Sequence, residues 1–164
     1  MHSAVWAHTG EYMLNFFGSK TYIDIQLGEL YRSRGRWRGT IDIGHHDAVP
    51  LAISGGWRGP DPEALAAARQ LAATFHEHLT VIADALYGHY EQAAAHFAGT
   101  PLATITSSET ALGFANLHSV AVSPLDGEMT VEYVYMVDWD DEHLLGARFQ
   151  GDRLVDFCGS TVPA

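Results

Sequence analysis

The chain has 164 residues and a formal net charge of −11, with nine Lys or Arg against twenty Asp or Glu. A chain of this length fits one domain whose core is stable without a disulfide or a metal, and a 47% hydrophobic content excludes a disordered chain. The acidic balance argues against a nucleic acid as partner and favours a basic protein, because opposite charges speed encounter.

The sequence predicts one domain over residues 1–164, with residues 1–11 as a candidate loose N-terminal segment. Cys158 is the only cysteine, so no intramolecular disulfide can form. The N-terminus lacks the positive flank and apolar core of a secretion signal, and no apolar run approaches the ~20 residues of a membrane-spanning helix. We therefore expect a cytoplasmic protein that binds no membrane and no cofactor. The sequence leaves the oligomeric state open.

Short strands are predicted first, between Tyr12 and Ser54. β-branched or aromatic residues alternate with polar ones over residues 22–27, 36–43 and 49–54. Clusters of glycine, proline and polar residues separate these runs and mark turns. The pattern predicts an antiparallel meander.

A long helix follows the meander. Asp61 is a candidate N-cap with Pro62 at the first helical position, and the helical pattern continues to about Ala98. An apolar stripe at steps of three and four residues predicts that one side of the helix packs on the sheet. An unbroken helix would be roughly 54 Å long at 1.5 Å per residue, so we expect a break near Gly88.

The last third of the chain predicts a short helix and a second meander. Residues 107–115 form the short helix, with Ser107 or Ser108 as its cap. Four further strands are predicted over residues 118–123, 128–139, 144–150 and 153–159. The order of strands, helices and strands is typical of an α+β fold.

Four arginines alternate along residues 32–38, at Arg32, Arg34, Arg36 and Arg38, with Trp37 among them. On an extended strand they would form a stripe on one side, with the indole on the other. Such a stripe could hold an acidic partner or a phosphate, or it could keep an edge strand soluble.

The stretch VDWDDEHLLG, residues 137–146, carries the candidate site. Alternation places Trp139 on the same face as the apolar residues before it, so we expect the indole to be packed. We expect the carboxylates after it to fall in a turn. Three interpretations remain open: a solvated acidic turn, a surface for a basic protein partner, or a metal site. The candidate partner-binding residues are Asp138, Trp139, Asp140, Asp141, Glu142 and His143.

The same stretch resembles a hairpin found in uncharacterised bacterial domain families, with the pattern W-D-x-E-H-G-x-G-x-x-F and a following strand that ends in glycine. The matching residues are Trp139, Asp140, Glu142, His143, Gly146, Phe149 and Gly159. Leu144 stands where the families have glycine. Some members resemble immunity proteins encoded beside polymorphic toxins, which implies an antidote or interaction role and no established reaction.

These observations favour a binding protein over an enzyme. We expect an immunity-type protein that binds a basic, toxin-like protein through its acidic hairpin. The alternative is a small metal-dependent hydrolase or metal-binding protein that uses Asp140, Glu142 and His143. Other histidines do not strengthen the alternative, because His78, His89 and His96 lie too far apart along one helix to bind one ion. We expect them at the boundary of the apolar stripe.

Overall fold

The computed structural model describes residues 20–159. The candidate loose segment and the part of the first meander before Lys20 lie outside these residues. The strands are β1 (Thr21–Asp24), β2 (Gly28–Ser33), β3 (Arg36–Ile43), β4 (His46–Ile53), β5 (Ala115–Leu125), β6 (Glu128–Val137), β7 (Asp140–Gln150) and β8 (Arg153–Gly159). The helices are α1 (Pro62–Ala93), α2 (Ser108–Gly113), and the 3₁₀ turns η2 (Ala94–Phe97) and η3 (Pro101–Thr104).

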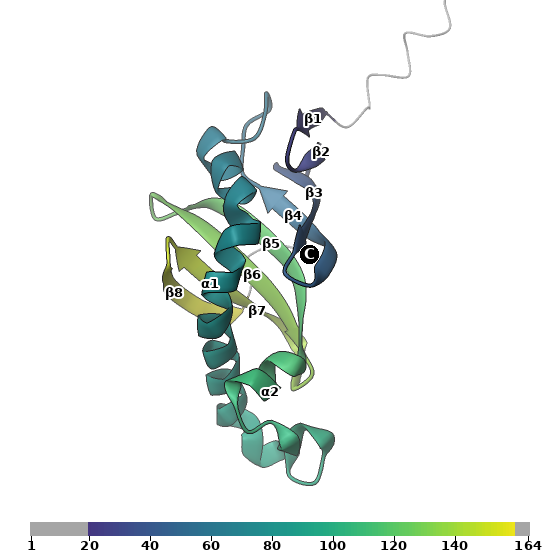
Figure 1. The fold of residues 1–164 in the computed structure, drawn as a ribbon, viewed down its shortest axis with the longest axis vertical. Helices are drawn as coiled ribbons and strands as arrows, with labels where there is room; N and C mark the ends of the chain where they lie inside the picture. Colours follow the sequence, from purple (N-terminus) through teal and green to yellow (C-terminus); the bar gives the residue numbers. More distant parts are fainter. Residues whose placement is uncertain (1–19, 160–164) are drawn as a thin grey trace, which may run out of the picture.

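All eight strands form one sheet in the order β1 to β8 (Figure 1). Every neighbouring pair is antiparallel except β4 and β5, which pair in parallel. A parallel pair needs a crossover connection, and α1 with the short helices supplies it. The predicted α+β order of meander, helices and meander is confirmed, and the parallel pair joins the two meanders into one sheet.

Helix α1 begins as the sequence predicts. Asp61 is its N-cap and accepts backbone N–H groups from Glu63 at 2.9 Å and Ala64 at 3.3 Å. The short helix α2 has Ser107 as N-cap, in a reciprocal capping arrangement with Thr110. Local capping chemistry therefore fixes the start of both helices.

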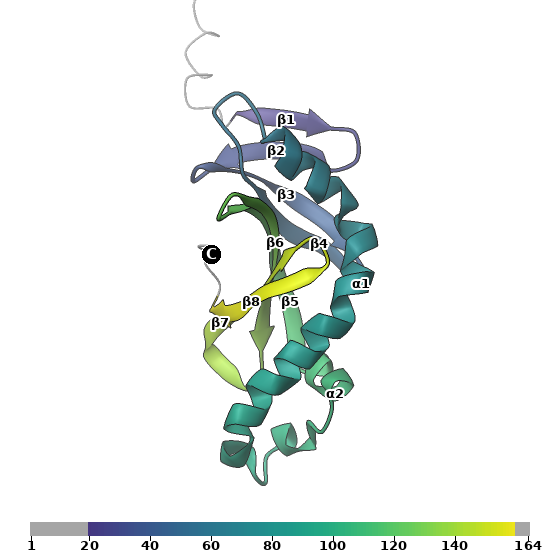
Figure 2. The same ribbon diagram turned by 90° about the vertical axis from the view of Figure 1, so that its left-hand side faces the viewer.

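The predicted break near Gly88 is wrong, because α1 runs without interruption from Pro62 to Ala93. Figure 2 shows the helix extending past the strands, with α2 packed beside its last turns. Tyr90 in this part donates a hydrogen bond from its hydroxyl to the Leu102 carbonyl at 2.8 Å. Contacts with the segment after α1 and with the turn between β6 and β7 thus stabilise the last turns of the helix.

The hydrophobic core lies between α1 and one face of the sheet. Its largest fully buried side chains are those of Trp37, Tyr133, Tyr135, Phe75, Phe149, Leu30, Ile43, Leu51, Ile53, Leu71, Ile82 and Leu86. They come from α1 and from strands of both meanders, so the helix holds the two meanders to one core. Among residues 20–159, no helix is long and apolar enough to cross a membrane.

The predicted arginine stripe is divided between two strands. A turn at Arg34 and Gly35, with φ of 48° and 79°, separates β2 from β3. Arg32 on β2 pairs with Trp37 on β3, and its guanidinium carbon lies 5.9 Å from the Trp37 ring centroid, on the face that carries α1. The prediction of one stripe is wrong because the chain reverses direction within it. Only the last two arginines stay together on one strand.

His78 connects the middle of α1 to the second meander. It is 3% exposed and stacks on the Phe149 ring with 3.9 Å between centroids. Its Nε2 lies 3.1 Å from the Gly151 carbonyl oxygen and its Nδ1 3.2 Å from the Tyr133 hydroxyl. A carbonyl oxygen only accepts, so Nε2 carries a proton, whereas the tyrosine hydroxyl can donate to Nδ1 or accept from it. Burial lowers the pKa of His78 and so favours the neutral imidazole, in which Nδ1 accepts from the Tyr133 hydroxyl.

Acidification is expected to destabilise the protein through His78. Burial lowers the pKa of His78 below its ordinary value of 6.5, although Asp152 and Glu77 act in the opposite direction. As the pH falls below about 6.5, His78 becomes protonated in the unfolded chain but stays neutral in the folded chain. The free energy of unfolding therefore decreases over this pH range. Chemical unfolding between about pH 7.5 and 5.5 should show a steeper loss in wild type than in His78→Gln. Equal slopes would contradict this assignment.

Candidate functional site

The candidate residues lie at the tip of the β6–β7 hairpin, which is near α2 in Figures 1 and 2. Two residues, Asp138 and Trp139, make the turn, and Val137 pairs with Asp140 across it. Asp140, Asp141 and Glu142 were expected in the turn, but they are the first residues of β7. We call residues 138–143 the acidic hairpin.

Trp139 is packed inside, as the alternation predicts, with 6% of its surface exposed. Its indole N–H donates to Nδ1 of His89 on α1 at 3.0 Å, and its ring meets Tyr90 edge-on at 5.6 Å between centroids. The backbone N–H of the preceding residue, Asp138, donates a hydrogen bond to the Phe114 carbonyl oxygen at 3.0 Å. The turn is thereby fastened to α1 and to the end of α2. Trp139 supports the hairpin from within and presents little surface to a partner.

Asp140 organises the first residues of β7. Its Oδ1 accepts the backbone N–H groups of Glu142 at 3.3 Å and His143 at 3.2 Å, and lies 3.0 Å from His143 Nδ1. Partial burial raises the pKa of Asp140, but the hydrogen bonds from His143 and the backbone outweigh it, and the net shift is downward. The hydrogen bond to Asp140 also raises the pKa of His143. Asp140 thus acts within the hairpin as an acceptor.

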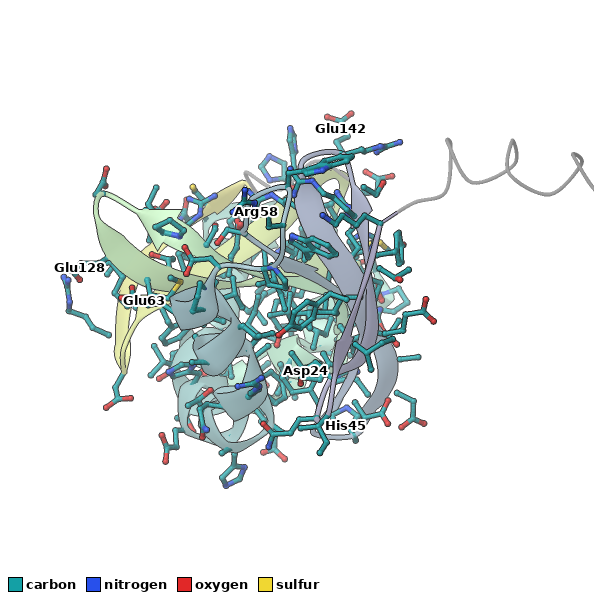
Figure 3. The ribbon with its side chains drawn as sticks, turned by 90° about the horizontal axis from the view of Figure 1, so that it is seen from above. Asp24, His45, Arg58, Glu63, Glu128 and Glu142 are labelled. Atoms are coloured by element: carbon teal, nitrogen blue, oxygen red, sulfur yellow. The ribbon has the colours of Figure 1, made fainter. Side chains whose placement is uncertain are left out.

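The other carboxylates of the hairpin face solvent. Asp138, Asp141 and Glu142 are exposed, and Figure 3 shows Glu142 projecting outward at the rim of the molecule. An open depression of about 420 Å³ lies along residues 136–144. Met136, 48% exposed, adds an apolar patch to it. An apolar patch rimmed by charge is a surface suited to protein contact.

Of the three candidate metal ligands, Asp140, Glu142 and His143, the structure brings the side chains of only two into contact. Asp140 and His143 are in contact, but in the part of the chain that the structure describes, no three His, Cys, Asp or Glu side chains are grouped to hold a metal ion. The helix histidines are also separated: His78 contacts Gly151 in the β7–β8 turn, His89 contacts Trp139 in the β6–β7 turn, and His96 is exposed at η2.

A buried ionic cluster stiffens the hairpin farther along its strands, on the face away from α1. Arg148 on β7 donates to Glu132 on β6 at 3.0 Å, and both residues are 5% exposed. Arg148 also contacts Asp156 and Cys158 on β8, the latter at 3.1 Å. Gly146 lies directly under the Glu132 carboxylate, which occupies the space where a Cβ would be. The sequence carries no signal for this cluster, because its members come from three strands.

Comparisons with family models, curated proteins and solved structures find no match to this chain. The site therefore rests on its own geometry. Sequence reasoning missed His89 as the partner of Trp139, since 50 residues separate the two along the chain. It also missed Met136, whose exposure is visible only when the hairpin register is known.

Proposed function

We propose that the protein is a non-enzymatic binding protein whose acidic hairpin binds a basic protein partner. The observation that carries the proposal is the group of three exposed carboxylates, Asp138, Asp141 and Glu142, at the hairpin tip, which Trp139 fixes from behind. A surface held in place before binding loses little conformational freedom on association. The charge of the hairpin is part of the net charge of −11, which would steer a positive partner toward the protein.

The negative charge of the acidic hairpin favours a class of partner with a positive surface. A nuclease-like toxin has a positive active face because it must hold phosphate, and an acidic antidote would cover that face. We therefore propose an immunity-type role, exercised in the bacterial cytoplasm.

The contact between Asp140 and His143 favours one alternative, a metal-binding or metal-dependent hydrolytic site. A carboxylate oxygen and an imidazole are both ligands that zinc, manganese or iron accept. Two ligands from one short segment still need others from a substrate or from elsewhere in the chain. Metal content and partner association can be measured separately, so one set of variants distinguishes the two functions.

The triple variant Asp138→Asn, Asp141→Asn, Glu142→Gln is expected to associate about tenfold more slowly with a captured basic partner at low salt, because charge steering acts on the association rate. The difference should shrink in high salt. The melting temperature should not change, since exposed charges contribute little to stability. The measurement is the association rate at two ionic strengths with a partner identified by mass spectrometry from the native host.

A matched control removes three exposed carboxylates in or next to the other two hairpin turns of the second meander: Asp126→Asn, Glu128→Gln and Asp152→Asn. Figure 3 shows Glu128 and Glu142 on different sides of the molecule. If both triple variants slow association equally, net charge is responsible and the hairpin is not the binding surface. Loss of bound metal in Asp140→Asn, with normal association, would support the metal alternative.

A further inference from the structure

Two arginines lie on the face of the sheet opposite α1. Trp37 points into the core, so alternation along β3 places Arg36 and Arg38 on the other face. Figure 2 shows α1 and α2 on one side of the sheet, and none of the described helices covers the face that carries the two arginines. Their side chains share a strand and a direction, with Cα atoms about 6.8 Å apart at 3.4 Å per residue.

Neither arginine has an acceptor among residues 20–159. Nη1 of Arg36 and Nε of Arg38 are shielded from water and have no hydrogen-bond partner, while both residues are partly exposed overall. The Ser54 hydroxyl, at the neighbouring end of β4, is also shielded and unpaired. A shielded donor without an acceptor is costly, by roughly 1 to 3 kcal/mol, more when it is charged. The arrangement suits an anion that supplies the missing acceptors.

The row of cross-strand neighbours beside Arg38 carries two small side chains and a carboxylate that is already paired. Arg38 pairs across the sheet with Ala52, Ala52 with Ala121, and Ala121 with Glu132. Ala52 and Ala121 have short side chains that do not project far from this face of the sheet. Glu132, the nearest carboxylate in this row, is already bound to Arg148. On the other side Arg38 pairs with Tyr31, which is 46% exposed and offers an aromatic surface.

We propose that Arg36 and Arg38 bind two carboxylates of an extended acidic segment of a partner protein. In an extended peptide the side chains of residues i and i+2 are also about 6.8 Å apart, so alternate carboxylates match the two guanidinium groups. Each guanidinium can hold one carboxylate with paired hydrogen bonds. A nucleic acid fits less well, because it carries a phosphate at every nucleotide and most of them would be repelled by a protein with a net charge of −11, whereas a protein segment can carry as few as two carboxylates.

The test uses a fluorescein-labelled peptide of alternating Glu and Val, and fluorescence anisotropy with the full chain at low salt. The double variant Arg36→Gln, Arg38→Gln is expected to bind the peptide at least tenfold more weakly, and each single variant less severely. Arg153→Gln, an exposed arginine on edge strand β8, should bind like wild type. Equal peptide affinity in the double variant and wild type would overturn the proposal.

Two further measurements distinguish peptide binding from a structural role of the arginines and from binding of a different anion. The double variant should melt at or above the wild-type temperature, because it removes two unpaired cations; a large decrease would show that the arginines are structural and would overturn the proposal. A ten-nucleotide oligothymidylate and inorganic phosphate serve as competing probes. If either binds more tightly than the peptide and depends on both arginines, the partner class is wrong. The acidic hairpin is unchanged in these variants, so the two proposals fail independently.

Discussion

Replacing Trp139 with alanine is expected to lower the free energy of unfolding by roughly 3 to 5 kcal/mol, the usual range for removing a buried aromatic side chain. Trp139 is 6% exposed, packs on Tyr90 and donates to His89. Its loss would leave a cavity between the hairpin and α1, and an imidazole nitrogen without its donor. Chemical unfolding monitored by far-UV circular dichroism measures the change.

Two smaller substitutions divide this effect into its parts. Trp139→Phe keeps most of the ring and removes the hydrogen bond, and His89→Ala leaves the indole N–H without its acceptor; each should cost roughly 1 to 3 kcal/mol. Both variants should keep the exposed carboxylates yet bind the basic partner more weakly, because the turn is no longer fixed. A Trp139→Ala protein that melts like wild type would place the indole outside the core and contradict the anchoring role.

Gly146→Ala is expected to be nearly as destabilising, although it adds only a methyl group. The new Cβ would meet the Glu132 carboxylate, which is buried and paired with Arg148. Moving Glu132 aside separates this ion pair, and breaking a buried pair costs roughly 3 to 5 kcal/mol. The change in the free energy of unfolding is again measured by chemical unfolding.

A matched control and a double-mutant cycle test the cause. A Cβ at Gly88 on α1 meets nothing within 4 Å, so Gly88→Ala should be neutral or stabilising by up to about 1 kcal/mol. In a Glu132→Ala background the methyl group at residue 146 has room, and its cost should fall to within about 1 kcal/mol. An unchanged cost in that background would show that Glu132 is not the residue that Gly146 accommodates.

The hairpin shows how far the sequence could be interpreted. Period-two alternation correctly predicted a packed Trp139, because a strand places alternate residues on one face whatever its neighbours are. It placed Asp140, Asp141 and Glu142 in the turn, since nothing local distinguishes a residue of a two-residue turn from the first residues of the next strand. The prediction of one arginine stripe was wrong for the same reason. It assumed an extended chain through Arg34 and Gly35, where a turn reverses the chain direction.

The sequence by itself determined the features that depend on neighbouring residues: the α+β order of elements, the cap at Asp61, a serine cap for α2 at residue 107 or 108, and most strand positions. These features arise from backbone sterics, local hydrogen bonds and apolar periodicity. Tertiary structure alone decided the unbroken length of α1, the parallel pairing of β4 with β5, and the contacts of His89 and Glu132. Those features depend on side chains that lie far apart along the chain, and only the folded arrangement brings them close enough for packing and charge to act.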